Sequence, residues 1–595
     1  MGAFNSAVIT KGGQELLAKV VAGKTKVAFT KIAVSENVLS GDLASLTGIG
    51  TIKQSAAVAS VVKQNGSNVK VSASFSNKDL VDGYYVRNIG LYATDPDVGE
   101  ILYSVSVADE STATADWMPP FSGIGLSSLL IDLVTAVSNA SSVEVIVDPT
   151  AMATVAQVVA LQEEIDDVKL YVGYGYEGTY GVEVDFPNNK IKRIAENEGL
   201  AAGADFDNLA PWARKRCILA DDGTVLAYYG DTAYTETGKL TTAVTKGGKS
   251  YPVGTPVQVM VEQNLFYVKA VPISTIDAPT GRGKQYNKVR FYISPEPRDG
   301  FIPMQGFKDA NGVLQSKIYL AAYEGVPYDD TSSAYITDNS GEADPTTAKF
   351  SSIAGVAPYR YITRADTRQM ANNRGAGWQL HNIFAASVSQ WLMLIEYASY
   401  DCQAKIGKGV SDSTNSAPLN TGGTSALGNG SGIPEGGTDG KCCVSYRGEE
   451  NLWGNVWTWL DGINIYNTKN PNDSAIYLKE YGTYTDDTSE GYTRLAFNPE
   501  QSSGYQSALG ADPAFPAISL PTELYGSETS GLAAYFYNSQ TGWRIARLGG
   551  YWNHGAKCSA WYFTLHSASS NSDDIIGGRL LYVPQGTHDE DEEVA

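Results

Sequence analysis

The sequence is poor in cysteine, in charged residues and in long apolar runs. Its 595 residues include five cysteines with no C-x-x-C pair, and charged residues make up 18% of the chain. Small secreted scaffolds are dense in cysteine, so we expect no disulfide framework and synthesis in a reducing cytoplasm. The longest apolar stretch, 383–395, is interrupted by serine and glutamine and is too polar to span a membrane. The N-terminus lacks the basic and then apolar pattern of a signal peptide.

Basic residues are also scarce relative to acidic ones. The chain has 44 Lys and Arg against 65 Asp and Glu, which gives a net charge of −21 at pH 7. Sequence-independent binding of nucleic acid needs basic patches that displace counterions, and anionic bilayers attract basic segments. The composition therefore predicts no nucleic-acid partner and no membrane insertion.

Motifs of catalysis and of metal binding are missing or out of context. The four histidines are scattered, and no HExxH, G-x-S-x-G or Walker sequence occurs. A G-x-G-x-x-G match at 173–178 follows a predicted helix and opens none, so it lacks the βαβ context of a dinucleotide site. Glu449 and Glu450 could flank a glycosidic bond, but a structural role is the favoured interpretation. We therefore predict no enzyme activity, no catalytic residue and no protein-bound metal.

Residues 1–150 have the pattern of one α+β domain. Thr10 can cap a short helix over 14–21, because its hydroxyl can accept a hydrogen bond from the first turn. Apolar residues alternate strictly over 69–75, and further strands are predicted over 84–93 and 101–107. Together these elements predict a helix packed on an antiparallel sheet.

Three separated motifs in this domain occur in a recognisable order: SAVITKGGQELLAKVVAG near the N-terminus, YVRNIGLYA at 85–93 and GEILY at 99–103. They resemble the N-terminal domain of phage tail-collar fibre proteins. In that family the domain fixes the fibre to the tail. The resemblance implies that residues 1–150 bind a tail or baseplate protein and that the chain is part of a virion.

A heptad pattern follows this domain and predicts a helical coiled-coil neck at 151–172. Its apolar positions, spaced 4-3-4-3-4, are Thr154, Val158, Leu161, Ile165, Val168 and Val172. Valine and isoleucine at one position with leucine at the other would favour two strands by the simple rule, whereas the fibre resemblance implies a homotrimer. An amphipathic linker helix packed on its own chain is the alternative.

The rest of the chain divides into a β-rich part, 173–360, and a mixed part, 361–585. The first contains short predicted strands and turns. The second contains predicted helices over 365–374 and 383–404, a loop over 411–440 that is rich in glycine and serine, and a tryptophan-rich segment. The last residues, 586–595, include five consecutive acids and are predicted to be disordered.

The segment 543–583 has predicted strands at both ends and no regular period between them. Aromatic rings among serine and asparagine give contact area at low entropic cost, and rigid flanks suit a surface that holds contact residues. The pattern favours a recognition surface, with a core role for half of the aromatics as the alternative.

The motifs RGAGW at 374–378, LIEY at 394–397 and GEENLWG at 448–454, together with the 543–583 segment, look like the C-type lectin fold. More narrowly, they resemble the variable proteins of diversity-generating retroelements and phage tropism determinants. In that family a tryptophan-rich frame holds a surface patch whose residues can be exchanged. The residues that fall at the family's variable positions are Tyr551, His554, Lys557, Trp561, Phe563, His566, Ser567, Asp573 and Asp574. Cys558, Trp561 and Tyr562 fit either the patch or the frame.

The sequence thus predicts an α+β multidomain protein: an α+β tail-attachment domain, a coiled-coil neck and a C-terminal C-type lectin fold. The resemblances imply a phage tail-fibre receptor-binding protein whose partner is a host cell-surface protein or glycan. The alternative is a calcium-dependent, glycan-binding lectin of a prophage or cell surface, because Asn571, Asp573 and Asp574 offer oxygen ligands. A fibre that cleaves sugars is a third, more distant interpretation.

Overall fold

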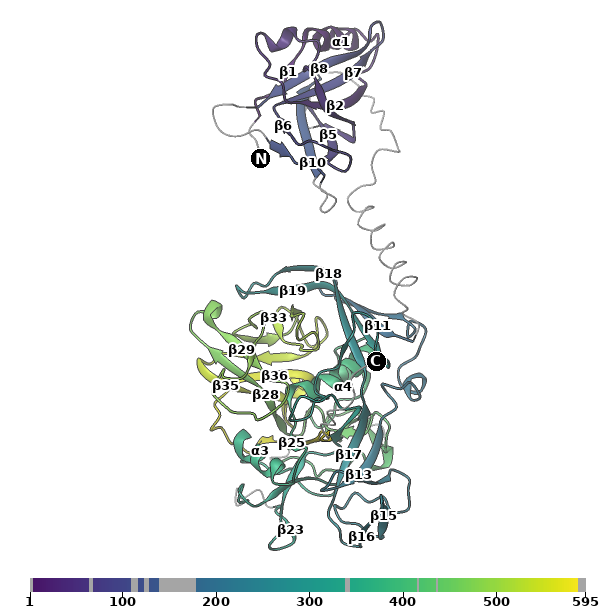
Figure 1. Cartoon of the computed structure of the whole chain (residues 1–595), viewed down its shortest axis with the longest axis vertical. Coiled ribbons are helices and arrows are strands. Elements are labelled where there is room, and N and C mark those ends of the chain that lie inside the picture. The colour runs from purple at the N-terminus through teal and green to yellow at the C-terminus, as the bar shows by residue number, and fades with distance from the viewer. Residues whose placement is uncertain are drawn as a thin grey trace. The chain divides into compact units, whose positions relative to one another are not determined.

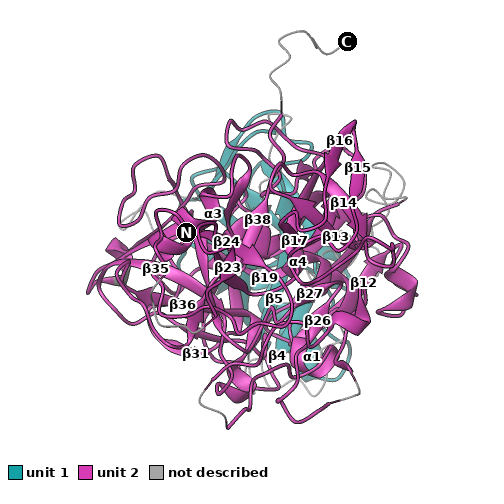
Figure 2. Ribbon diagram, turned by 90° about the horizontal axis from the view of Figure 1, so that it is seen from below, with its two compact units in different colours: residues 1–169 teal, residues 170–595 magenta. Residues whose placement is uncertain are grey.

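The computed structural model describes residues 4–63, 68–108, 116–121, 128–137, 178–337, 343–414, 417–434 and 437–586. The chain forms two compact units, Met1–Lys169 and Leu170–Ala595 (Figure 2). The predicted neck, 151–172, and all but the first residue of the predicted acidic tail lie outside the described residues. The finer boundaries near 360 and 585 stay predictions.

The first unit combines one helix with small antiparallel sheets. Helix α1 (Lys11–Val21) begins as predicted, where the Thr10 hydroxyl accepts a hydrogen bond from the Gly13 amide at 3.1 Å. The predicted alternation over 69–75 lies on β5, and its apolar side chains are buried in the core of this unit. One sheet has the order β1 (Val8–Ile9), β8 (Gly99–Val107), β7 (Asn88–Asp95), β2 (Phe29–Ser35) and β3 (Ile52–Ala57). The other sheets are β10 (Ser128–Ala136), β5 (Asn68–Ser76) and β4 (Ser60–Lys63), and the pair β6 (Tyr84–Val86) and β9 (Asp116–Met118).

Three larger sheets form most of the second unit (Figure 1). The six-stranded sheet has the order β14 (Val225–Tyr228), β13 (Lys215–Ala220), β17 (Val257–Asn264), β21 (Lys317–Ala321), β38 (Leu580–Tyr582) and β25 (Trp378–Leu380). The seven-stranded sheet contains β12 (Lys190–Ala195), β11 (Tyr180–Asp185), β19 (Lys284–Ser294), β18 (Tyr267–Asp277) and β20 (Ile302–Pro303), with β32 (Ala508–Ala511) and β33 (Pro521–Glu523) at its side. Strand β38 comes from the C-terminal end of the unit and lies between β21 and β25, so this sheet joins strands that are distant in the sequence.

The eight-stranded sheet carries the segment that the sequence singled out. Its order is β30 (Thr493–Arg494), β29 (Ala475–Leu478), β28 (Trp457–Asn467), β35 (Gly542–Gly549), β36 (Ser559–Ser567), β34 (Tyr535–Tyr537) and β31 (Ser503–Tyr505), with β37 (Ile576–Gly577) parallel to β28. The predicted rigid flanks of the segment are therefore strands β35, β37 and β38. Smaller sheets pair β15 (Val244–Lys246) with β16 (Lys249–Tyr251), β22 (Gly325–Asp329) with β23 (Ala334–Tyr335) and β24 (Lys349–Ser352), and β26 (Ser445–Tyr446) with β27 (Glu449–Glu450).

Two main helices accompany these sheets. Helix α3 (Arg364–Asn372) begins at the cap Thr363, and α4 (Ile383–Tyr397) begins where the Asn382 side chain accepts a hydrogen bond from the Ala385 amide at 2.9 Å. The predicted helix over 383–404 is too long, because Ala398 adopts the left-handed conformation, with φ of 47°, and ends α4. A separate short helix, α5 (Cys402–Lys405), follows. All but the last residue of α4 are buried, so this helix lies inside the unit.

The described residues are mostly β-strands, with few helices. The predicted α+β class therefore overstates the helical share, because the 173–360 part and the tryptophan-rich segment both form sheets. No helix in the described ranges is long and apolar enough to cross a membrane.

Candidate functional site

Strand β36 divides the predicted contact residues between two faces of its sheet, because successive side chains on a strand point to opposite sides. Trp561, Phe563 and Leu565 lie on one side, and Phe563 and Leu565 join a core that includes Ile383 and Phe384 of helix α4. Tyr562, Thr564 and His566 lie on the other side. On that second side β35 contributes Arg547, which is the register partner of Thr564.

The second side carries a cluster of aromatic rings, which we call the aromatic face: Trp457, Tyr535, Tyr551, His554 and Tyr562, with Arg547 and Lys557 among them. The ring centroids of Tyr551 and His554 are 4.0 Å apart, and those of Trp457 and Tyr562 are 4.6 Å apart. His554 lies 5.5 Å from Trp457, and Tyr535 lies 5.6 Å from Tyr562. Tilted and edge-to-face contacts at these distances are favourable, so the rings hold one another in place.

A short, tightly held connection between β35 and β36 positions Tyr551 and His554. Gly549 and Gly550 both have positive φ, and a Cβ on Gly550 would approach the Cys558 sulfur to 2.6 Å. Glycine is therefore required where the chain leaves β35. The His554 amide donates to the Tyr551 carbonyl at 3.1 Å, and the Gly555 amide donates to the Ser411 carbonyl at 2.7 Å. The loop is thus a fixed platform for two partly exposed rings.

Arg547 is a buried cation without a paired anion. Its side chain is 7% exposed, and its guanidinium lies over the Trp457 ring at 5.0 Å. Within the described residues it forms no hydrogen bond or ion pair, and its Nε is a buried atom without a partner. Burial lowers the pKa of Arg547 to about 10, although the hydroxyl of Tyr562 and the carboxylate of Asp573 act in the opposite direction.

Both histidines of the segment are held neutral at pH 7. Burial lowers the pKa of His554 to about 3, and the positive charges of Lys557 and Arg547 act in the same direction. Burial also lowers the pKa of His566 to about 4, assisted by Arg547 and Arg544. The Lys557 ammonium lies 4.6 Å from the centre of the Tyr535 ring. Positive charges of Lys557 and Arg547 thus act on His554, whereas the carboxylates of Asp574 and Asp573 act on the neighbouring Tyr551.

Asp573 and Asp574 lie in the loop between β36 and β37, and both are partly exposed. The Tyr361 amide donates to the Asp573 carbonyl at 3.0 Å, and the Arg360 guanidinium donates to the Asp574 carbonyl at 2.8 Å. A hydrogen bond with the Asp573 side chain is the main cause that raises the pKa of Asp574, followed by burial and the repulsion of the two charges. The two carboxylates provide hydrogen-bond acceptors at this edge of the surface.

The structure separates the nine predicted contact residues into two groups. Six are partly exposed: Tyr551, His554, Lys557, His566, Asp573 and Asp574. Three are buried, with an exposed fraction of 1% each: Trp561, Phe563 and Ser567. Burial excludes these three from direct contact with a partner, which corrects the prediction for them. The physical reason is that β36 is covered on both faces, which leaves only His566 of its nine residues partly exposed.

Tyr562, which fitted either role, lies on the aromatic face and is 5% exposed. The sequence analysis did not single out Arg547 or Tyr535 as site residues. For Arg547 a signal existed: a lone arginine stands between Ala546 and Leu548 in a predicted strand. For Tyr535 there was none, because β34 reaches the face through parallel pairing with β36.

The described residues contain no group of three or more His, Cys, Asp or Glu side chains that could hold a metal ion. Glu449 is buried and forms an ion pair with Arg214 at 2.6 Å, and Glu450 is buried and accepts from the Thr424 amide at 2.6 Å. These contacts favour the structural role of the two glutamates over a role in cleaving a glycosidic bond.

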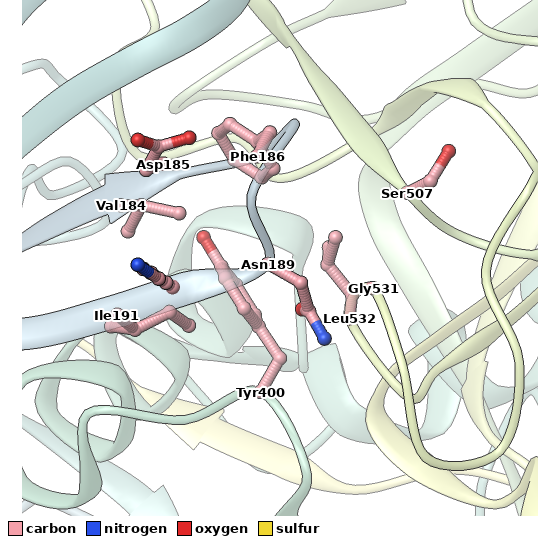
Figure 3. A pocket seen from close by; sticks show the side chains of 10 residues that line it. Val184, Asp185, Phe186, Asn189, Ile191, Tyr400, Ser507, Gly531 and Leu532 are labelled. Atoms are coloured by element: carbon pink, nitrogen blue, oxygen red, sulfur yellow. The ribbon is translucent and has the colours of Figure 1, made fainter.

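A small pocket lies elsewhere in the unit, beside the hairpin of β11 and β12 (Figure 3). Its lining includes Val184, Phe186, Ile191, Tyr400 and Leu532. The Tyr400 hydroxyl is buried without a partner in the described residues. A narrow space that Asp185, Asn189 and Ser507 also line suits an ordered water rather than an organic ligand.

Comparison with known proteins gives two results. Among solved structures, the chain is similar to the Major Tropism Determinant U1 variant, with 13% identity over 66% of this chain and 77% of that chain, at a TM-score of 0.20. It is also similar to the Major Tropism Determinant P3c variant, with 11% identity, the same coverage and a TM-score of 0.21. At this identity and TM-score the likeness supports no inference by itself. No curated protein matches the chain.

The second result concerns the first unit. Residues 1–157 match the family described as phage tail-collar fibre protein, N-terminal. The match covers the helix, the sheets and the three motifs on which the resemblance was based. Residues 1–157 of the chain therefore match the N-terminal domain of the phage tail-collar fibre family.

Proposed function

We propose that this chain is the receptor-binding protein of a phage tail fibre and attaches the virion to its host through the aromatic face. The observation that carries the proposal is the aromatic face itself. Rings from three strands and a rigid loop meet beside an unpaired, buried arginine at a partly exposed surface. Large rings and arginine dominate the binding energy of protein interfaces, and rigid positioning lowers the entropic cost of binding.

The first unit, in this proposal, binds a tail or baseplate protein and the second unit carries the receptor site. Three copies assemble through the predicted neck at 151–172, so that several weak sites bind one cell together. The second unit has the C-type lectin fold of retroelement-diversified proteins. Burial supports a division between frame and patch: Trp453 and Trp459 are fully buried, whereas Tyr551, His554 and Lys557 are partly exposed.

We propose binding without catalysis and without a metal ion. Among its partly exposed polar groups, the aromatic face has no carboxylate pair that could flank a reacting bond. The two histidines of the segment are poor general bases, because their pKa values are lowered. The calcium-dependent alternative would use Asp573 and Asp574 as oxygen ligands. Adsorption that survives a chelator would separate the two interpretations.

The test is competition for phage adsorption by the purified full-length chain. The Tyr551→Ala chain is expected to compete at least about 10-fold less well than the wild type, since truncation of a central aromatic contact commonly costs 2 kcal/mol or more. Tyr229→Ala is the matched control, because Tyr229 is 39% exposed and follows β14 in a different sheet. Equal competition by the wild-type and Tyr551→Ala chains, with unchanged thermal unfolding, would remove the aromatic face from host binding.

A further inference from the structure

Arg547 differs from the other buried arginines of the described residues. Arg214, Arg290, Arg364 and Arg447 form ion pairs with carboxylates at 2.6–2.8 Å. Arg216 and Arg579 donate to backbone carbonyls at 2.8 Å and 2.7 Å, and Arg374 donates to the Phe350 carbonyl at 2.9 Å. Arg547 has no such partner, and its contact is the Trp457 ring. Among the buried arginines of the described residues, Arg547 is thus the one without any hydrogen bond or ion pair, although the Arg579 Nε also lacks a partner.

Two nitrogen atoms near Arg547 also lack a hydrogen-bond partner among the described residues. The Trp457 Nε1 and the His554 Nδ1 are buried and, like the Arg547 Nε, have no partner in the part of the chain that the structure describes. The Trp457 and His554 rings touch at 5.5 Å, and Arg547 lies over the Trp457 ring. An indole N–H and a guanidinium can only donate. Leaving buried donors and a buried charge unpaired is costly, so a group that accepts from them would gain binding energy.

A ligand group that accepts hydrogen bonds here must match the Arg547 guanidinium in charge and in shape. A guanidinium presents a planar fork that pairs with both oxygens of a carboxylate. Lys557 and Arg544 add positive potential, because they act on His554 and His566 in the same direction as Arg547 does. Asp573 also acts on Arg547, but no ion pair joins the two side chains within the described residues. Near Arg547 a ligand would therefore meet donors for an anion, and the loop after β36 supplies the carboxylate acceptors Asp573 and Asp574.

We propose that Arg547 binds the carboxylate of an acidic sugar on the host surface, while the hydroxyls of that sugar donate to Asp573 and Asp574. This inference rests on the proposed function and names the ligand class of its site. A sugar acid carries one carboxylate and several hydroxyls on one ring, which suits a cation beside an acidic pair. The side chain of an aspartate or glutamate in a protein receptor carries no hydroxyls, so Asp573 would repel it without compensation.

The test uses the full-length chain and three probes: D-glucuronate, its neutral amide D-glucuronamide, and acetate. Saturation-transfer NMR and calorimetric titration measure binding. We expect glucuronate to bind at least about 10-fold more tightly than the amide, which lacks the charge, and than acetate, which lacks the hydroxyls. Binding should weaken as salt rises, since the site is partly exposed.

Variants assign the effect to one side chain. Arg547→Gln is expected to abolish glucuronate binding, and Arg547→Lys to retain part of it, because lysine keeps the charge without the fork. Arg494→Gln is the matched control, because it removes a positive charge from β30 of the same sheet and leaves Arg547 in place. If Arg547→Gln lowers the thermal unfolding temperature, Arg547→Met provides a second variant that retains the aliphatic packing over Trp457.

The outcomes separate this inference from the proposed function. Glucuronate binding that persists in Arg547→Gln, or equal binding of acid and amide, would overturn the inference. Adsorption that needs Tyr551 but not Arg547 would overturn it and leave the proposed function in place. Loss of chain binding after protease treatment of the host surface would instead indicate a protein receptor and overturn the sugar assignment. Loss of glucuronate binding together with loss of adsorption in Arg547→Gln alone supports both.

Discussion

The two faces of strand β36 differ in whether the buried polar atoms beside them have hydrogen-bond partners. On one face Phe563 and Leu565 pack with Ile383 and Phe384 of α4 in a closed apolar core. On the other face Tyr562 lies among rings and beside Arg547, where three buried nitrogen atoms have no partner within the described residues. All nine residues of β36 except His566 are buried, so the two faces differ in what they pack against rather than in exposure. Where a protein leaves such groups unsatisfied, function is the usual reason.

The largest expected effect follows from a substitution on the apolar face of β36. Phe563→Ala is expected to lower the free energy of unfolding of the second unit by about 3–5 kcal/mol, because it removes a 1%-exposed ring from a packed core. Tyr551→Ala on the opposite face is expected to change it by less than about 1 kcal/mol. Denaturant unfolding of the full-length chain measures both. Equal losses in the two variants would mean that the faces do not divide as described.

The next largest effect concerns the unpaired charge of Arg547 on the other face of the strand. Arg547→Met is expected to leave the free energy of unfolding unchanged or to raise it by about 1 kcal/mol, since an apolar side chain has no charge to desolvate. The same unfolding measurement applies. Arg364→Met is the matched control, because Arg364 pairs with Asp486 at 2.6 Å and its loss leaves a buried partner unsatisfied. A loss of several kcal/mol in Arg547→Met would show that Arg547 stabilises the fold.

The pH dependence tests the buried histidines of the aromatic side. The pKa of His554 is about 3 and that of His566 about 4 in the folded chain, against about 6.5 when unfolded. Between these values the unfolded chain binds more protons, so stability falls as the pH decreases from 6.5 towards 4. The double variant His554→Gln/His566→Gln is expected to flatten this fall, as thermal unfolding at several pH values would show. An unchanged slope would contradict the burial of these rings.

The smallest expected effect concerns metal ions. A chelator is expected to leave both the unfolding temperature and host adsorption unchanged, because the proposed contacts are direct side-chain contacts that need no metal ion. Added calcium should likewise have no effect. A fall in adsorption on chelation that calcium restores would favour the calcium-dependent lectin and place the ligand at Asp573 and Asp574 rather than at Arg547.

Local signals in the sequence predicted much of the frame. Thr10 caps α1, the alternation over 69–75 forms β5, and the predicted flanks of the 543–583 segment are strands. Trp453 and Trp459 of the tryptophan-rich segment are buried, as a frame role requires. These predictions depend on short-range rules of capping, period and side-chain size, which a single sequence contains.

The sequence predicted less well which residues of the site are buried and which are partly exposed. Strand β36 is covered on both faces, so its residues read as a continuous run of aromatic and small side chains rather than an alternation. Trp561 and Phe563 therefore looked equivalent to Tyr551. Arg547 and Tyr535 join the aromatic face through pairings between strands that are distant in the sequence. Such pairings depend on tertiary structure, and no local pattern encodes them.

The most direct test is hydroxyl-radical footprinting of the full-length chain bound to isolated host envelopes. We predict that oxidation of Tyr551, Tyr535 and His554 slows several-fold on binding, while oxidation of Tyr229 and Tyr525 in the same unit is unchanged. Unchanged oxidation of the three aromatic-face residues, with protection at another surface of the second unit, would contradict the account.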